Sequence, residues 1–282
     1  MPTGVSPFRA SLRHATLALA CVLGMSASLA EPVIKTGGTG SAMPVLAALG
    51  AAFKQTRPEA DIVTLPGLGS SGAIKALGAG AVDLALSARP LKPDERSAGF
   101  QEQVAARTPL VFAGTGTYPG LTLARVADIH AGTQQAWPDG SMLRLILRPE
   151  NDGETALLRA ASPTLDRAVR QALARPGMHI ALTDQDAAHA IGTIPGAFGL
   201  TTLAMVAAAK PPIHAFTLDG ISPSLDTLNH GRYRLYKPLY LVAAANAAEP
   251  VRTFVSFIQS PQGGNILIRH GYQPLAATAN RH

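Results

Sequence analysis

The segment PGLGSSGAIKALGAGAVDLALSARP, residues 66–90, decides how the rest of the chain is interpreted. It carries a Gly-x-Gly-x-x-Gly pattern, formed by Gly67, Gly69 and Gly72. This spacing between a strand and a helix is typical of a dinucleotide-binding turn. The same helix start, with the hydroxyls of Ser70 and Ser71 beside free backbone N–H groups, would also suit a small anion. A third interpretation is that the glycines only shape a tight turn.

A dinucleotide site also needs an acidic side chain at the end of the following strand, where it binds the ribose. The following strand, VDLALSARP, ends in Ala88 and Arg89, and Asp83 lies at its opposite end. Arg89 would suit a 2′-phosphate, so an NADP-dependent enzyme stays open as an alternative. The short helix after Gly72 and the predicted export of the chain argue against that enzyme.

The first thirty residues are predicted to be a signal peptide. Arg9 and Arg13 precede the apolar run ATLALACVLGMSASLA, which ends in a small-x-small pattern at Ala30. The run is too short for a convincing membrane span, although an uncleaved anchor stays open. We expect cleavage after Ala30 and a periplasmic protein that lacks cysteine, because Cys21 is the only one.

The composition disfavours several kinds of site. The net charge is +6 for the whole chain, and the basic residues are scattered, which gives no support for nucleic-acid binding. No histidines stand at metal-ligand spacing, so neither a metal nor a cofactor is expected. The segment LGSSG misses the Gly-x-Ser-x-Gly pattern of a hydrolase by one residue.

Predicted strands and helices alternate along the mature chain. PVIKTGG, DIVTLPG, VDLALSARP, TPLVFAGT, MLRLILRP and YKPLYLVAAA are strand-like, and helical segments separate most of them. TDQDAAHAIGT is expected to be a short helix capped by Thr183 or Asp184. This alternation predicts an α/β fold with mainly parallel sheets. Ligands bind such sheets at the carboxyl ends of the strands.

Two further helix starts repeat the chemistry of the glycine loop. TGGTGSAMP places Thr39, Gly40 and Ser41 before a helix, and LRPENDGETALL places Arg148 at a strand end before another. An arginine can bind an oxyanion through two parallel hydrogen bonds. The alternative for Arg148 is a solvated surface side chain.

At this point the chain resembles the phosphate-type solute-binding proteins of ABC importers. The resemblance covers nearly the whole mature chain in order, and its most specific parts are the Gly-x-Gly-Ser-Ser-Gly segment and a C-terminal Ser-Pro-x-Gly. It is carried by GLGSSGAIKALGAGAVDLALSARPLKPDE, TGGTGSAMPVLAALGAAFKQTRP, LTLARVADIHAGTQQAWPDG, AIGTIPGAFGLTTLAMV, YKPLYLVAA and FVSFIQSPQGGNILIRHGYQPL.

The resemblance implies a two-lobed periplasmic-binding-protein-like (type II) α/β fold with the ligand in the cleft between the lobes. Lobe one would comprise residues 31–112 plus 242–282, and lobe two residues 113–241. The family's anion contacts fall on Ser41, Ser70 and Arg148. The wider set of candidate ligand-binding residues is Thr39, Gly40, Ser41, Ser70, Ser71, Gly72, Ser87, Arg148, Asp152, Gly153, Glu154 and Thr155.

Three departures from the family pattern bear on the ligand. Gly40 stands where a hydroxyl residue is usual, and Ala88 follows Ser87 where some members carry an acid. Asp152-Gly153-Glu154 replaces Ser-Gly-Thr, unless a one-residue gap aligns Thr155. The two carboxylates would either accept a hydrogen bond from a protonated phosphate or cap the helix and point outward.

We therefore expect a monomeric, non-enzymatic protein that captures an inorganic oxyanion, phosphate first, for an inner-membrane ABC permease. The alternatives are a diverged binding or sensory module of the same fold with another small ligand and, less favoured, an NADP-dependent enzyme.

Overall fold

The computed structural model describes residues 33–275, so the predicted signal peptide, with Cys21 and Ala30, lies outside the described residues. Within this range, no helix has both the length and the apolar character needed to cross a membrane.

The elements before residue 115 alternate between strand and helix. They are β1 (Val33–Gly38), the 3-10 helix η1 (Gly40–Ala42), α1 (Met43–Thr56), β2 (Asp61–Leu65), α2 (Gly69–Gly78), β3 (Leu84–Ser87), α3 (Pro93–Ser97) and β4 (Phe100–Gly114). β4 is longer than expected, because only its second half, from Thr108, has the apolar pattern of a buried strand.

The middle of the chain holds ten elements, and four more follow. The middle ones are α4 (Leu123–Ala131), β5 (Arg144–Leu147), α5 (Gly153–Ala160), α6 (Pro163–Ala174), β6 (His179–Ile180), α7 (Asp184–Thr193), β7 (Ala197–Thr202), α8 (Leu203–Ala208), β8 (His214–Ala215) and α9 (Leu225–Asn229). The last are β9 (Tyr236–Ala244), α10 (Glu249–Gln259), α11 (Pro261–Arg269) and β10 (Gln273–Pro274).

The strands form one path in the order β2-β1-β3-β9-β4-β7-β5-β6, with β8 and β10 paired to β4. The α/β class is confirmed, but the expectation of mainly parallel sheets is wrong. β1 pairs in parallel with β2 and β3, whereas the long strands β4 and β9 pair antiparallel with each other and with their other neighbours. The reason is that β9 and β4 lie side by side in the middle of the sheet and run in opposite directions, so every pairing that involves either of them is antiparallel.

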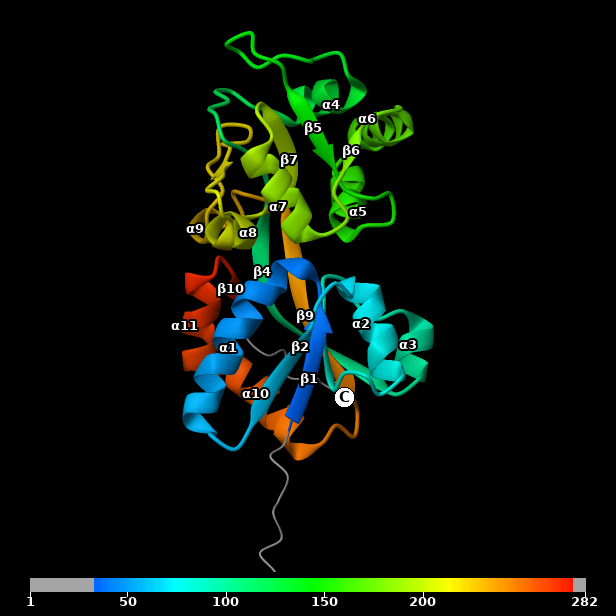
Figure 1. Ribbon diagram of the computed structural model, residues 1–282, viewed down its shortest axis with the longest axis vertical. Helices are drawn as coiled ribbons and strands as arrows, with labels where there is room; N and C mark the ends of the chain where they lie inside the picture. The colour runs from blue at the N-terminus through cyan, green and yellow to red at the C-terminus, as the bar shows by residue number, and fades with distance from the viewer. Residues whose placement is uncertain (1–32, 276–282) are drawn as a thin grey trace, which may run out of the picture. The chain divides into compact units, whose positions relative to one another are not determined.

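The two largest hydrophobic cores meet along β4, whose Ala105 and Ala106 belong to one and whose Leu110 and Phe112 belong to the other. The N-terminal strands pack against α1, α10 and α11 through Phe53 and Phe254, whose ring centroids lie 5.0 Å apart. Figure 1 shows these helices on one side of β1 and β2, with α2 and α3 on the other. The other core gathers around Trp137, Phe198 and Phe216. The lobe boundaries at 112/113 and 241/242 stay predictions; they fall inside β4 and β9.

Candidate functional site

The loop after β1 lies tightly against the end of β3. A Cβ built at Gly38 would stand 2.0 Å from the Leu86 carbonyl oxygen, so only glycine allows this approach. The next amide, Thr39 N–H, donates to the same oxygen at 2.9 Å. The loop therefore enters η1 with Thr39 and Ser41 buried, 4 % and 1 % exposed.

A buried lysine lies beside this loop. Lys237 is the second residue of β9 and is only 3 % exposed. Its Nζ donates to Glu154 Oε1 at 2.9 Å and to Asp184 Oδ1 at 3.0 Å. Both carboxylates are also buried. Two carboxylates on one ammonium satisfy a charge that would otherwise be costly to bury.

Arg148 lies on the other side of Glu154 and is 6 % exposed, so it is not a solvated surface side chain. Its Nη1 donates to the Ala181 carbonyl at 2.8 Å and its Nη2 to Asp152 Oδ2 at 2.7 Å. Its Nε lies 3.9 Å from Glu154 Oε2, and neither of these buried atoms has a hydrogen-bond partner among residues 33–275.

The carboxylates of the Asp-Gly-Glu segment behave differently from each other. Asp152 caps α5, because its Oδ1 accepts the Glu154 N–H at 2.9 Å. Glu154 is fully buried and faces the two cations. Gly153 is exposed, and the buried Thr155 donates to the Arg148 carbonyl at 3.4 Å.

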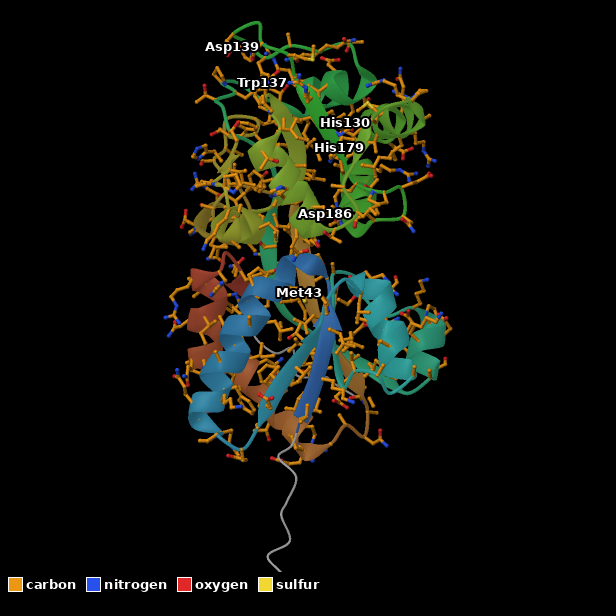
Figure 2. The ribbon with its side chains drawn as sticks, in the orientation of Figure 1. Met43, His130, Trp137, Asp139, His179 and Asp186 are labelled. Atoms are coloured by element: carbon orange, nitrogen blue, oxygen red, sulfur yellow. The ribbon has the colours of Figure 1, made fainter. Side chains whose placement is uncertain are left out.

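The first turn of α7 brings a carboxylate onto the β1 loop. Asp184 Oδ2 accepts the Ser41 N–H at 2.9 Å, and Gln185 Nε2 donates to the Gly40 carbonyl at 2.8 Å. A Cβ at Gly40 would stand 2.6 Å from Asp184 Oδ2, so the missing side chain makes room for the carboxylate. Met43 and Asp186 mark the starts of α1 and α7 in Figure 2.

Charge is balanced in this cluster when one carboxylic acid keeps its proton. Burial raises the pKa of Glu154 to about 8, with Lys237 opposing and Asp184 reinforcing the shift. Burial also raises the pKa of Asp184, but Lys237 and hydrogen bonding with Glu154 outweigh burial and hold it well below its usual range. A protonated Glu154 leaves the carboxylates of Asp152 and Asp184 to balance the charges of Arg148 and Lys237.

The glycine loop that opens α2 makes separate contacts. Gly67 and Gly69 take positive φ of 73° and 63°, which places the helix start immediately after the turn. Ser70 Oγ accepts the Ala88 N–H at 2.9 Å, and Ser87 Oγ donates to the Arg89 carbonyl at 2.6 Å. Among residues 33–275, no acceptor faces the Ser70 hydroxyl hydrogen, which can donate.

Arg89 is held by Ser71 and Glu95. Its two terminal nitrogens donate to the two oxygens of Glu95 at 2.7 and 2.8 Å, and it also contacts the Ser71 hydroxyl at 3.2 Å. The hydrogen bond from Arg89 holds the pKa of Glu95 down at about 2. An arginine clamped in this way does not offer the free fork that a 2′-phosphate needs.

The structure thus gathers some predicted residues and leaves others in a second group. Gly40, Ser41, Arg148, Asp152 and Glu154 meet in one cluster. Ser70, Ser71 and Ser87 bond with Ala88 and Arg89, and no hydrogen bond within the described range joins the two groups. Gly72 lies inside α2.

Sequence reasoning missed two members of the cluster. Lys237 is a single charge in the otherwise apolar YKPLYLVAA strand, and that isolation was the available signal. Asp184 was considered only as a possible helix cap; Thr183 is the cap and Asp184 points to Ser41.

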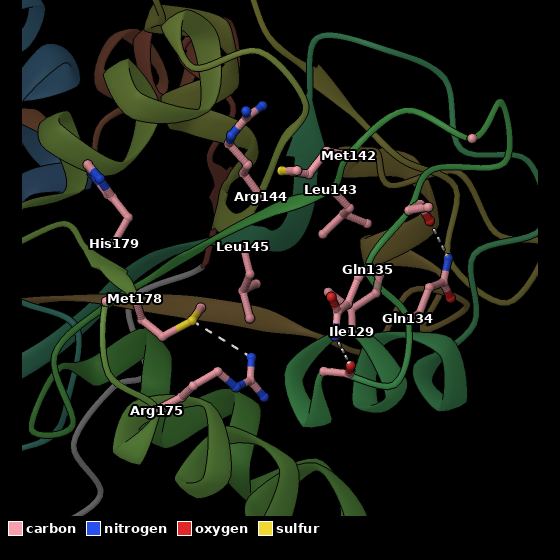
Figure 3. A pocket seen from close by; sticks show the side chains of 14 residues that line it. Ile129, Gln134, Gln135, Met142, Leu143, Arg144, Leu145, Arg175, Met178 and His179 are labelled. Carbon is pink, nitrogen blue, oxygen red and sulfur yellow. Dashed lines mark hydrogen bonds between the residues drawn. The ribbon is translucent and has the colours of Figure 1, made fainter.

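A cavity of about 660 Å³ lies elsewhere, between β5, α4 and the end of α6 (Figure 3). Gln134, Arg144, Arg175 and His179 are among its lining residues, and none of the predicted site residues lines it. Arg175 already donates to the His130 carbonyl at 3.0 Å. Over residues 33–275 no His, Cys, Asp and Glu group has the arrangement of a metal site.

Comparison with known proteins gives one family and many structural likenesses. A family model described as a PBP superfamily domain matches residues 25–262. A search of curated proteins finds no match.

Three solved structures share the fold at low identity. One is a putative phosphate ABC transporter substrate-binding protein with bound phosphate from Clostridium perfringens, at 20 % identity and TM-score 0.73, covering 86 % of this chain and 99 % of that one. Another is an ABC-type phosphate transport receptor from Vibrio cholerae, at 18 % identity and TM-score 0.62, covering 85 % of this chain and 99 % of that one. A third is a high-affinity periplasmic phosphate-binding protein with bound phosphate, at 14 % identity and TM-score 0.66, covering 86 % of this chain and 90 % of that one. These likenesses confirm the expected two-lobed fold.

Proposed function

The chain belongs to the PBP superfamily. We therefore propose that it is an exported solute-binding protein that captures a small inorganic oxyanion for an inner-membrane ABC permease, with phosphate as the favoured ligand. The three structural relatives described above are phosphate-binding or phosphate-transport proteins by name. The proposal places the mature protein in the periplasm as a monomer, after cleavage behind Ala30.

One observation carries the proposal. The carboxylate of Asp184 accepts hydrogen bonds from the Ser41 amide and from Lys237, at 2.9 and 3.0 Å. A carboxylate and a phosphate present the same kind of acceptor oxygen to an amide and an ammonium. The position beside Ser41 therefore has the donors that an oxyanion needs.

The proposed ligand contacts extend this position. Ser41 would supply its amide and Arg148 its guanidinium, while the free hydroxyl hydrogen of Ser70 is available from the second loop. These groups bind an anion in its ground state, and the proposal includes no catalytic step, metal or cofactor.

Calorimetric titration of the purified protein with phosphate, sulfate, molybdate and tungstate tests the proposal. We expect saturable 1:1 heat with phosphate and a weaker response to sulfate, because a protonated anion suits a site that contains carboxylates. Folded protein that gives no heat with any of the four oxyanions would contradict the proposal.

Arg148→Lys tests the anion contacts more closely, with Arg144→Lys at the other end of β5 as the matched control. Lysine keeps the charge but loses the two-pronged geometry, so we expect phosphate affinity to fall in the first variant and to hold in the second. Unchanged affinity in Arg148→Lys would remove Arg148 from the proposed site.

A second candidate is a binding or sensory module of the same fold whose ligand has changed. It is favoured by the pairing of both cations with carboxylates of the chain. A thermal-shift screen of small organic solutes separates the two: stabilisation by an organic solute, with none by oxyanions, favours the changed ligand.

A further inference from the structure

Asp184 joins two segments that lie far apart in the sequence. It belongs to α7, whereas Ser41 follows β1, 143 residues earlier in the chain. Gln185 adds a second bridge to the Gly40 carbonyl. The carboxylate is 4 % exposed, so the chain itself fills the position that Ser41 and Lys237 create.

Both cations around this position are already in use. Lys237 is shared by Glu154 and Asp184, and Arg148 is bound to Asp152. Arg148 Nε and Glu154 Oε2 are the buried atoms of the cluster that lack hydrogen-bond partners among residues 33–275, and they lie 3.9 Å apart. An incoming dianion would meet the charged carboxylates of Asp152 and Asp184, which repel it unless one of them leaves.

Asp184 is the carboxyl group best placed to leave. Asp152 is held as the cap of α5, and Glu154 is fully buried beneath the two cations. Asp184 stands in the first turn of its helix, beyond the N-cap Thr183, and its approach depends on the absence of a side chain at Gly40.

We propose that Asp184 is a tethered carboxylate that occupies the anion position at the Ser41 amide, and that an external oxyanion binds by displacing it. Asp184 then sets the affinity of the site: the ligand must compete with a carboxylate that is always present. The inference rests on the proposed function, because it needs an external oxyanion as the displacing ligand.

Calorimetric titration with inorganic phosphate of the unchanged protein, Asp184→Ala and Asp186→Ala tests the displacement. Both variants remove one carboxylate from the first turn of α7. Among residues 33–275, however, the Asp186 carboxylate accepts a hydrogen bond only from the Thr183 N–H. We expect Asp184→Ala to bind phosphate about tenfold more tightly or better, since a like charge next to the ligand is gone. Asp186→Ala should bind as the unchanged protein does.

Asp184→Ala should stay folded, because Glu154 remains to pair with Lys237. Circular dichroism checks this, and Asp184→Asn, which keeps the shape and loses the charge, serves as the second variant with an expected smaller gain.

The outcomes separate this inference from the proposed function. If the unchanged protein binds phosphate and both Asp184 variants bind it equally well or more weakly, the displacement is overturned and the proposed function stands. Absence of binding by the unchanged protein and by folded variants, with all four oxyanions, overturns both.

Discussion

Two of the three helix starts that the sequence marks as anion sites, the loops before η1 and α2, differ in what surrounds them. The loop at Gly67–Gly72 has the stronger glycine pattern, yet within the described range its serines form hydrogen bonds only with the Ala88 amide and with Arg89. The loop at Thr39–Ser41 has the weaker pattern, yet it borders a buried cluster of two cations and three carboxyl groups. Glycines and hydroxyls mark where amides can be exposed, but charges brought from distant segments decide which loop has an anion's chemistry.

The largest expected effect comes from the lysine that distinguishes the first loop's surroundings. Lys237→Met leaves Glu154 and Asp184 buried without their ammonium, and breaking a buried pair on one side costs about 3–5 kcal/mol. Burial lowers the pKa of Lys237, but the two carboxylates outweigh it and raise it above its usual value, so the side chain is charged at any pH used. Urea denaturation measures the loss in the free energy of unfolding.

Lys54→Met is the matched control for that substitution. Lys54 pairs with Asp61 at 3.0 Å on the surface, with half of each side chain exposed, and such a pair is worth about 0–1 kcal/mol. An equal loss of unfolding free energy in Lys237→Met and Lys54→Met would mean that the cluster is hydrated like a surface ion pair. The first loop would then not differ from the second in its surroundings.

Glycine substitutions compare the loops directly. Gly38→Ala forces a methyl group onto the Leu86 carbonyl, 2.0 Å away, and we expect a loss of about 3 kcal/mol in unfolding free energy. In Gly69→Ala the added methyl group contacts nothing within 4 Å, so the only cost is the strain of a non-glycine residue at φ +63°. We expect that strain to lower the unfolding free energy by about 1 kcal/mol. Thermal denaturation of both variants gives the order. A reversal would show that positive φ, and not close backbone contact, is what the loops need from glycine.

The pH dependence of stability tests whether Glu154 keeps its proton. With a pKa raised from 4.5 to about 8 in the folded chain, its contribution is complete below pH 4.5, declines as pH rises, and is gone above about pH 8. His130, whose pKa burial lowers to about 4, acts in the opposite direction but only below about pH 6.5. The window from pH 6.5 to 8 therefore reports on Glu154.

Glu154→Gln imitates the protonated acid and should abolish this decline. We expect the unchanged protein to lose up to about 2 kcal/mol between pH 6.5 and 8, and the variant to stay nearly level. Glu59→Gln, on the exposed turn before β2, should retain the decline. A decline that persists in Glu154→Gln would assign it to another group and make Glu154 a charged member of the cluster.

Much of the local structure could be predicted from the sequence. Residues such as Gly132, which takes φ +82° after α4, and Thr183, which caps α7, signal their helix ends through interactions within a few residues. The sequence also placed Arg148 at a strand end and acids at the following helix start. These are short-range properties of the chain.

The cluster itself could not be predicted in the same way. Lys237, Glu154 and Asp184 come from β9, α5 and α7, and only the tertiary fold decides that they meet. A carboxylate at a helix start has the same sequence pattern whether it caps the helix, as Asp152 does, or turns inward, as Glu154 does. The direction of β4 and β9 escaped for a similar reason, because strand pairing is a long-range choice.

The smallest expected effect belongs to the loop with the stronger pattern. Ser70→Ala removes the acceptor of the half-buried Ala88 amide and should cost about 1 kcal/mol of stability. Ser71→Ala, at an exposed position, should stay within about 0.5 kcal/mol. Phosphate affinity should fall about tenfold or less in Ser70→Ala, since one hydrogen bond to an anion is at stake. A loss of about a thousandfold would place the centre of the site at the Gly67–Gly72 loop and reverse the ranking of the two loops.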